Sequence, residues 1–363
     1  MPNLLTTVEF LSSSGVVLDV RSPAEYEQGH IPGSVSFPLF TDAERAEVGT
    51  CYKQQGRSQA VELGLAIAAP KLTQFVQQAK QLAPDLTLRI HCWRGGMRSG
   101  SMAWLMETAG FQVSVLDQGY KGFRHWVRET LAIPKPILTL GGMTGTGKTA
   151  VLHALADQGE QVLDLEALAN HRGSSYGGLG LPPQPSTEQF ENLIAIAWAK
   201  LDATRPIWIE AESRMVGTCR VPNELFEQMM AATVLQIERS RPERIALLQE
   251  VYGSADRGEL VIATDRLQRR LGGQNAKRAI AFIQQGNLEP AIEIVLDYYD
   301  KTYLYDLQRR NVPIYPINVE ELSATEAAAK LIKQSNHLSS ENLLLSQHLA
   351  IPHPLTSNLK SSI

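Results

Sequence analysis

Residues 137–149 read Ile-Leu-Thr-Leu-Gly-Gly-Met-Thr-Gly-Thr-Gly-Lys-Thr, an apolar strand followed by a Gly-x4-Gly-Lys-Thr loop. The loop opens a predicted helix that ends near Gly159, and this strand–loop–helix context is the one in which the pattern binds phosphate. Its backbone amides are expected to wrap a diphosphate, Lys148 adds a positive charge, and the Thr149 hydroxyl is placed to reach a magnesium ion. The expected phosphate-binding residues are Gly142, Gly145, Gly147, Lys148 and Thr149.

Short apolar strands alternate with helical segments on both sides of this loop. Such alternation predicts parallel sheets covered by helices on both faces, which is an α/β fold. Residues 243–310 are predicted to be mostly helical. The predicted strands are 16–20, 35–37, 88–91, 113–116, 137–140, 161–165, 207–210, 233–237 and 313–317.

The length of the chain indicates two domains. Single cores stop growing at roughly 250–300 residues, and this chain has 363. Residues 132–136 (Ala-Ile-Pro-Lys-Pro) are the predicted linker, so we expect one domain over 1–131 and a second over 137–334. Residues 335–363, rich in Ser, Asn, Leu and His without a clear period, are expected to form a flexible tail.

Composition narrows the class of protein. Hydrophobic residues make up 44% and charged residues 20%, as in soluble globular proteins. Long apolar runs and a basic, apolar leader are absent from the sequence, so a cytoplasmic protein without a membrane partner is expected. Three cysteines without a CxxC pair argue against a disulfide framework or structural zinc site and leave room for one reactive thiol. A formal net charge of −4 argues against a whole-surface nucleic-acid binder but allows a local basic face.

A second anion-binding loop lies at residues 91–99, His-Cys-Trp-Arg-Gly-Gly-Met-Arg-Ser, between a predicted strand and a predicted helix. Loop amides and the helix N-terminus would favour the thiolate of Cys92, which is the expected catalytic nucleophile. The two glycines let the backbone curl, and the Arg98 guanidinium is expected to bind two oxygens of an oxyanion. The expected loop residues are Arg94, Gly95, Gly96 and Arg98.

The cysteine loop fits both a thiol phosphatase and a rhodanese that carries a persulfide. Residues 19–34, Asp-Val-Arg-Ser-Pro-Ala-Glu-Tyr-Glu-Gln-Gly-His-Ile-Pro-Gly-Ser, resemble the rhodanese N-terminal motif nearly residue for residue. The first domain is therefore expected to be a rhodanese-like parallel sheet with flanking helices, followed by a P-loop α/β domain with a helical C-terminal part. The loop is one residue longer than in many sulfurtransferase rhodaneses. We hypothesise that a wider cradle suits a larger atom or a phosphate-bearing donor.

Further residues could support the phosphate site. The strand 207–210 ends in carboxylates, so Glu210 or Glu212 is expected to orient a metal ion or water, unless the two are a surface acidic pair. Mg²⁺ is kept as a candidate cofactor, although no metal site is certain from the sequence. The segment 171–177 either lines a second substrate site or is a plain loop. The possible supporting residues are Gly64, Arg172, Ser174, Glu210, Glu212 and Arg214.

Arginines and lysines concentrate between residues 239 and 278. Such runs are usually solvated helix faces, but in a mildly acidic chain they are also the best candidates for contacts with RNA phosphates. The candidates form two groups, Arg239, Arg241 and Arg244, and then Arg266, Arg269, Arg270, Lys277 and Arg278.

Taken in order, these motifs resemble the bacterial tRNA 2-selenouridine synthase family from about residue 5 to residue 330. The most family-specific part is residues 42–56, Asp-Ala-Glu-Arg-Ala-Glu-Val-Gly-Thr-Cys-Tyr-Lys-Gln-Gln-Gly. The resemblance implies a transferase, both a geranyltransferase and a selenotransferase, that acts on tRNA carrying wobble 2-thiouridine. Its co-substrates would be geranyl diphosphate and selenophosphate, S-geranyl-2-thiouridine would be the intermediate, and Cys92 would carry selenium.

Two other functions stay open at this point. The first is an ATP-dependent P-loop kinase fused to a rhodanese or thiol-phosphatase domain, with Glu210 contacting metal and Arg239 and Arg241 clamping phosphate. The second is a carrier protein without catalytic activity, in which Cys92 merely holds the chalcogen. Gly64, which lies shortly after the family-specific stretch, is kept as a position where a backbone could approach closely.

Overall fold

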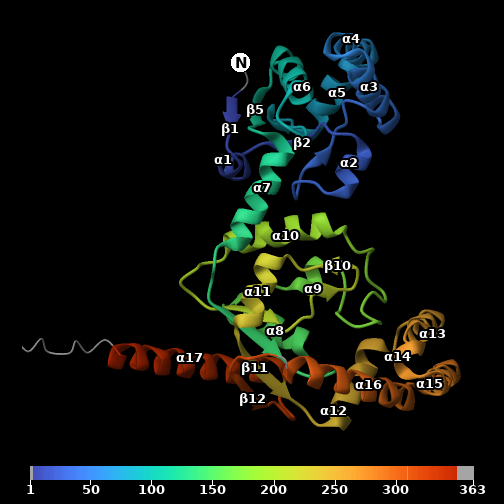
Figure 1. Cartoon of the computed structure of the whole chain (residues 1–363), viewed down its shortest axis with the longest axis vertical. Helices are drawn as coiled ribbons and strands as arrows, with labels where there is room; N and C mark the ends of the chain where they lie inside the picture. The colour runs from blue at the N-terminus through green and yellow to red at the C-terminus, as the bar shows by residue number, and fades with distance from the viewer. Residues whose placement is uncertain (1–2, 309, 350–363) are drawn as a thin grey trace, which may run out of the picture.

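The computed structural model describes residues 3–308 and 310–349 and contains two five-stranded sheets, one in each half of the chain (Figure 1). All neighbouring strands in both sheets are parallel, and their order is β1-β5-β4-β2-β3 in the first and β12-β11-β6-β8-β7 in the second. The predicted α/β fold class is thus confirmed. The strands are β1 Asn3–Leu5, β2 Val16–Asp19, β3 Val35–Ser36, β4 Thr87–His91, β5 Gln112–Leu116, β6 Ile137–Gly141, β7 Gln161–Val162, β8 Ile207–Glu210, β9 Met215–Val216, β10 Cys219–Arg220, β11 Thr233–Glu238 and β12 Ile314–Asn318.

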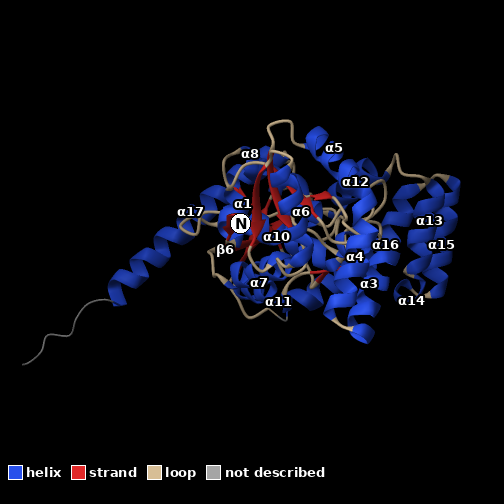
Figure 2. Ribbon diagram, turned by 90° about the horizontal axis from the view of Figure 1, so that it is seen from above, coloured by secondary structure: helices blue, strands red, loops and turns tan. Residues whose placement is uncertain are grey.

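Helices cover both faces of each sheet (Figure 2). In the N-terminal half they are α1 Thr7–Ser12, α2 Pro23–Gln28, α3 Asp42–Gln55, α4 Arg57–Ala68, the short 3₁₀ helix Ala69–Lys71, α5 Leu72–Leu82, α6 Met97–Thr108 and α7 Gly119–Ala132. In the C-terminal half they are α8 Lys148–Asp157, α9 Leu165–Leu168, α10 Thr187–Lys200, α11 Asn223–Ala231, α12 Arg241–Tyr252, α13 Arg257–Arg266, α14 Gln268–Leu271, α15 Gly273–Gln285, α16 Leu288–Gln308 and α17 Ala324–Leu349.

The two halves share one hydrophobic core. Phe10, Tyr120 and Phe123 from α1 and α7 belong to the same buried cluster as Phe190 and Trp198 of α10. Figure 1 shows α7 descending from the first sheet onto α10, which lies across the top of the second half. A shared core of this kind holds the two sheets in one arrangement, because separating them would expose large apolar side chains to water.

Directional hydrogen bonds also join the two halves at this interface. The Tyr120 hydroxyl lies 2.8 Å from Glu188 Oε1 and accepts a 2.9 Å hydrogen bond from Asn192 Nδ2. The backbone N–H of His30 donates to Gln189 Oε1 at 2.7 Å. His30 lies in the 19–34 motif, so this motif serves the junction between the halves as well as its own domain.

Two local predictions need correction. The predicted strand 161–165 ends at Val162, because the Asp164 side chain accepts a hydrogen bond from Ala167 N and caps helix α9. The predicted tail from residue 335 is helical as far as Leu349, since α17 continues without a Gly or Pro to break it and Leu338 is buried. Residues 350–363 lie outside the described residues.

Strand β1 and the β9–β10 hairpin were not predicted from the sequence. Within residues 3–308 and 310–349, no helix has both the length and the apolar character that crossing a bilayer requires.

Candidate functional site

The cysteine loop follows β4, a central strand of the first sheet. Cys92 is only 3% exposed, and its Sγ lies 3.2 Å from Ser99 Oγ in the first turn of α6. Gly95 has φ +65°, and a Cβ there would lie 2.9 Å from the carbonyl oxygen of Leu116. A side chain at this position would therefore force the loop away from β5, as the predicted need for glycine implies.

Helix α7 anchors the same loop from the opposite side. The N–H groups of Tyr120 and Lys121 donate to the carbonyl oxygens of Cys92 (2.8 Å) and Trp93 (2.9 Å). Because α7 also packs on α10, the cysteine loop is attached through one helix to the second half of the chain.

Residues of the 19–34 motif pack beside the cysteine loop. Asp19 and Arg21 form a fully buried ion pair at 2.6 Å, and the Arg21 guanidinium lies 3.7 Å from the centre of the Tyr120 ring. Burial lowers the pKa of His91, which precedes the cysteine, to about 4 despite the nearby Asp19 carboxylate. The ring is therefore neutral at neutral pH, and positive charge near Cys92 comes from arginine and backbone dipoles.

The arginines of the loop take different positions. Arg98 forms an ion pair with Glu25 from α2, at 2.7 Å between Nη1 and Oε2, rather than pointing freely into the loop. Burial acts to raise the pKa of Glu25, but the Arg98 hydrogen bond and charge outweigh it and lower that pKa. Arg94 is exposed. An arriving oxyanion would thus compete with Glu25 for the Arg98 guanidinium.

The phosphate-binding loop joins β6 to α8 at the carboxyl edge of the second sheet. Lys148 Nζ donates to Gly142 O at 3.0 Å, and the Gly142 N–H donates to the Tyr303 hydroxyl at 2.8 Å. Arg239 Nε and Arg244 Nε donate to the carbonyl oxygens of loop residues 146 and 144. These arginines fix the shape of the loop from outside, so Arg239 is engaged in support rather than free to clamp phosphate.

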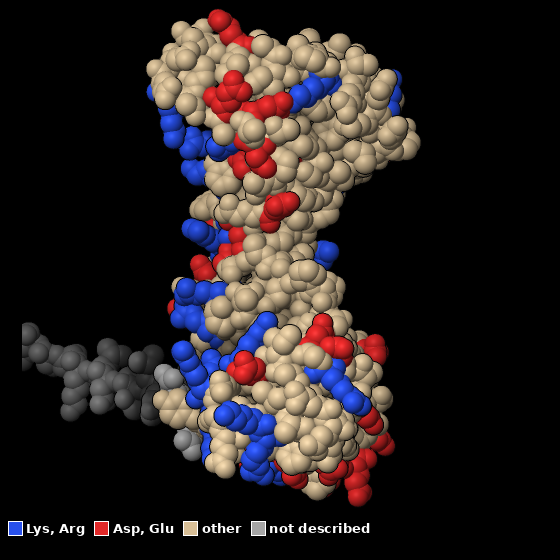
Figure 3. All heavy atoms as spheres, turned by 90° about the vertical axis from the view of Figure 1, so that its right-hand side faces the viewer, with Lys and Arg blue, Asp and Glu red and all other residues tan. Residues whose placement is uncertain are grey.

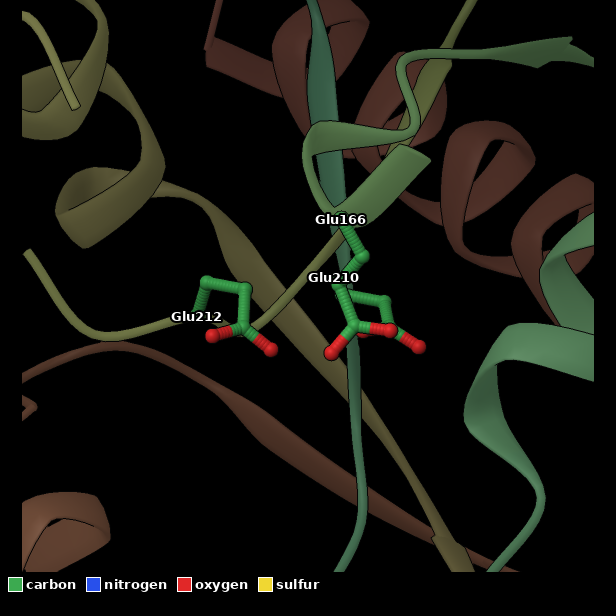
Figure 4. A group of neighbouring side chains, drawn as sticks. All are labelled: Glu166, Glu210 and Glu212. Carbon is green, nitrogen blue, oxygen red and sulfur yellow. The ribbon is translucent and has the colours of Figure 1, made fainter. Parts of the chain in front are cut away.

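The carboxyl groups of Glu166, Glu210 and Glu212 converge (Figure 4). One oxygen each from Glu166, Glu210 and Glu212 lies within 4.8 Å of the others, and the Thr149 hydroxyl lies 3.0 Å from Glu166 and 3.1 Å from Glu210. Burial, with a further contribution from the neighbouring carboxylates, raises the pKa of Glu166 to about 9 and that of Glu212 to about 7. Burial also raises the pKa of Glu210.

This cluster fits a magnesium ion. All the side-chain donors are oxygens, which Mg²⁺ prefers. Within the described part of the chain, the buried Oε2 of Glu210 has no hydrogen-bond partner. Carboxylates at this distance repel one another and would repel a diphosphate, and a divalent cation would relieve both repulsions.

Comparisons with known proteins cover both halves. Residues 135–333 match the tRNA 2-selenouridine synthase AAA domain, and residues 7–125 match the rhodanese-like domain. A tRNA 2-selenouridine synthase of Bordetella bronchiseptica is 37% identical over 331 residues, covering 81% of this chain and 89% of that protein. One of Marinobacter nauticus is 34% identical over 330 residues, covering 81% and 89%. The chain belongs to the tRNA 2-selenouridine synthase family. The resemblance seen in the sequence is confirmed.

Within this tRNA 2-selenouridine synthase framework, the remaining sequence candidates separate into two groups. The 171–177 loop lies against the carboxylates, since a Cβ on Gly173 would be 2.6 Å from Glu166 Oε1. In that loop Arg172 donates to Leu179 O, and Ser174 lies 3.4 Å from the Tyr252 hydroxyl. By contrast, Arg214 donates a hydrogen bond to Asn223 and lies over the Phe226 ring, so its side chain is engaged by α11.

Gly64 lies in the other half, on α4, and lines a cavity near the cysteine loop. Glu166 and Tyr303 were missed. The strand-end signal that marked Glu210 does not mark Glu166, because Glu210 ends β8 whereas Glu166 lies in α9, after β7 has ended. Tyr303 had no signal either, since it lies in a long helix far along the chain from Gly142.

Proposed function

We propose that this member of the tRNA 2-selenouridine synthase family is a tRNA-modifying transferase that converts wobble 2-thiouridine to 2-selenouridine. The observation that carries the proposal is the occurrence of a thiol loop and a diphosphate cradle on two halves with a shared core. Sulfur doubly bonded to a base is a poor leaving group, and alkylation improves it. A reaction that first alkylates sulfur and then replaces it needs one site of each kind.

The first step is assigned to the phosphate-binding loop with geranyl diphosphate as donor. The base sulfur attacks the first carbon of the geranyl group as the carbon–oxygen bond breaks, and the electron pair leaves with the diphosphate. The base then loses its N3 proton. Lys148 and the loop amides stabilise the departing charge.

Glu166, Glu210, Glu212 and Thr149 would hold a magnesium ion, which would neutralise charge on the diphosphate. A small apolar pocket of about 60 Å³ adjoins the loop at Thr144, and its lining includes Leu248, Tyr252, Val295 and Tyr299. It offers an apolar surface beside the loop but not the volume of a whole geranyl chain.

The second step is assigned to Cys92 with selenophosphate as donor. The thiolate sulfur bonds to selenium, the selenium–phosphorus bond breaks with its electron pair on phosphorus, and phosphite leaves. The terminal selenium then attacks C2 of the base and displaces geranylthiolate. A thiol reductant supplies two electrons to cleave the remaining sulfur–selenium bond, which releases the product and restores Cys92.

The surface supports an anionic partner that contacts both halves. Figure 3 shows Lys and Arg side chains recurring down one side of a single face, from the first half to the second. Such a distribution attracts a phosphate backbone even though the formal net charge is −4.

The test is stepwise. The purified chain is incubated with 2-thiouridine tRNA and geranyl diphosphate, and then with selenophosphate and a thiol, and nucleosides are analysed by mass after each addition. S-geranyl-2-thiouridine followed by 2-selenouridine is expected. Vigorous ATP hydrolysis without tRNA, together with no nucleoside change, would favour the kinase alternative.

A further inference from the structure

A large cavity lies in the N-terminal half, between α3 and α4 on one side and α6 on the other. Its volume is about 860 Å³, within the range of roughly 300–1,000 Å³ that is usual for small-molecule sites. Most lining side chains are apolar, and they include Phe40, Val48, Val61, Leu72, Met102 and Leu105. A cavity of this size and character is suited to a hydrocarbon ligand.

Large apolar side chains surround this cavity while remaining exposed to solvent. Tyr52 is 59% exposed, Leu65 62%, Met97 51% and Trp104 63%. They come from three different helices and face one space, so they form a patch rather than scattered surface residues. A clustered apolar surface that no other part of the described chain covers indicates a binding site.

The position of the cavity connects it with Cys92. Met97 and Arg98, the first two residues of α6, line the cavity and directly follow the loop that begins at Cys92. Of the lining residues, only Arg57 and Arg98 are charged, and both are positive; Arg98 is paired with Glu25, so an anionic group would have to compete for it. A ligand that is apolar in one part and attached to an anionic chain in another would match both features.

We infer that this cavity binds the geranyl group of the S-geranylated wobble base during the exchange of sulfur for selenium. The inference rests on the proposed function and adds a place for the leaving group, separate from the phosphate-binding loop. With the hydrocarbon in the cavity, C2 of the base lies toward the Cys92 loop. The carbon–selenium bond forms as the carbon–sulfur bond breaks, and the electron pair leaves on geranylthiolate, whose chain is already bound.

This assignment predicts that the second step recognises the alkyl chain itself. Stem-loop RNAs that carry S-geranyl- or S-methyl-2-thiouridine separate this recognition from the chemistry, because both present an alkylated sulfur as leaving group. The full chain should selenate the geranyl substrate with a KM lower by about tenfold or more, since apolar contacts in a pocket discriminate on that scale.

Two variants test the cavity from different walls. Gly100→Leu adds a side chain on α6 where no atom lies within 4 Å of the position that a Cβ would take, so it reduces the free volume without a clash. Leu65→Asp places a charge on the exposed rim. The matched control is Val8→Asp on α1, which is 62% exposed and does not line the cavity. Thermal melting checks that all three fold.

Both cavity variants should raise KM for the geranyl RNA toward its value for the methyl RNA, leave methyl selenation unchanged, and leave geranylation of 2-thiouridine RNA unchanged. Equal losses on both substrates, or none on either, would overturn the inference. If the unmodified chain selenates neither substrate, the proposed function fails instead. If the chain selenates both RNAs with equal KM, only the cavity assignment fails, and a different occupant must cover the patch.

Discussion

Replacing Glu212 by Gln should stabilise the protein in the absence of metal while impairing alkylation. Burial and the Glu210 carboxylate raise the pKa of Glu212 from 4.5 to about 7. The native state therefore holds this proton more tightly than the unfolded chain does. The titration of Glu212 does not change the free energy of unfolding below about pH 4.5. It lowers that free energy as the pH rises toward 7, and its contribution is then constant.

The magnitude follows from that pKa. Each pKa unit corresponds to about 1.4 kcal/mol, so a rise from 4.5 to about 7 sets an upper limit of about 3 kcal/mol on the cost at pH 8. Glu212 is partly exposed, and screening reduces the expected gain on substitution to about 1–2 kcal/mol. For proteins larger than about 150 residues this corresponds to a Tm rise of about 2–8 °C.

The assay is thermal melting at pH 5 and pH 8, with and without Mg²⁺. Glu212→Gln should exceed the parent at pH 8 without metal and approach it at pH 5. Mg²⁺ should raise the Tm of the parent at pH 8 and have less effect on the variant. The control is Glu227→Gln, an exposed residue of α11, which should change neither Tm nor its Mg²⁺ response. A variant equal to or less stable than the parent at pH 8 would refute the reasoning.

Three further predictions follow from the same geometry. Gly95→Ala should abolish selenation and lower the free energy of unfolding by about 1–3 kcal/mol, because the φ of +65° at Gly95 and the nearby Leu116 carbonyl oppose a side chain. The control is Gly96→Ala, since no atom lies within 4 Å of the position of its Cβ, and the two variants are compared by selenation rate and melting curve. Tyr120→Phe removes the hydroxyl between Glu188 and Asn192 and should lower the free energy of unfolding by about 1–3 kcal/mol. Calorimetry should show that the two halves melt less cooperatively, and one unchanged transition would contradict this. Phosphorus NMR should detect phosphite as selenium loads onto Cys92, whereas release of phosphate alone would favour direct attack by selenophosphate.

Much of the fold could be predicted because its determinants are local. Apolar runs marked the central strands, and Gly-rich loops at their ends marked both candidate anion sites. Glu210 and Glu212 could be expected beside Thr149, because parallel strands β6 and β8 end at the same sheet edge. Glu166 lies in α9 rather than at the end of a strand, and only the course of the chain from β7 into α9 brings it to Thr149.

Other features depend on contacts between distant segments and leave no local pattern. The pairing of Arg98 with Glu25 follows from how α2 packs beside the cysteine loop. The cavity in the N-terminal half exists because α3 and α4 lie apart from α6. The sequence of residues 42–68 does not show that separation. The junction of the halves likewise depends on His30 and Tyr120 meeting α10.

The most direct test of the division of labour between the two loops compares Cys92→Ser with Lys148→Ala on one 2-thiouridine tRNA, with both co-substrates and a thiol present. Nucleoside mass analysis should find S-geranyl-2-thiouridine accumulating with Cys92→Ser, since only the second step needs the thiol. Lys148→Ala should leave mostly unmodified 2-thiouridine and should still selenate tRNA that is already geranylated. Loss of geranylation in a folded Cys92→Ser protein, or normal geranylation by Lys148→Ala, would contradict the assignment of one step to each loop.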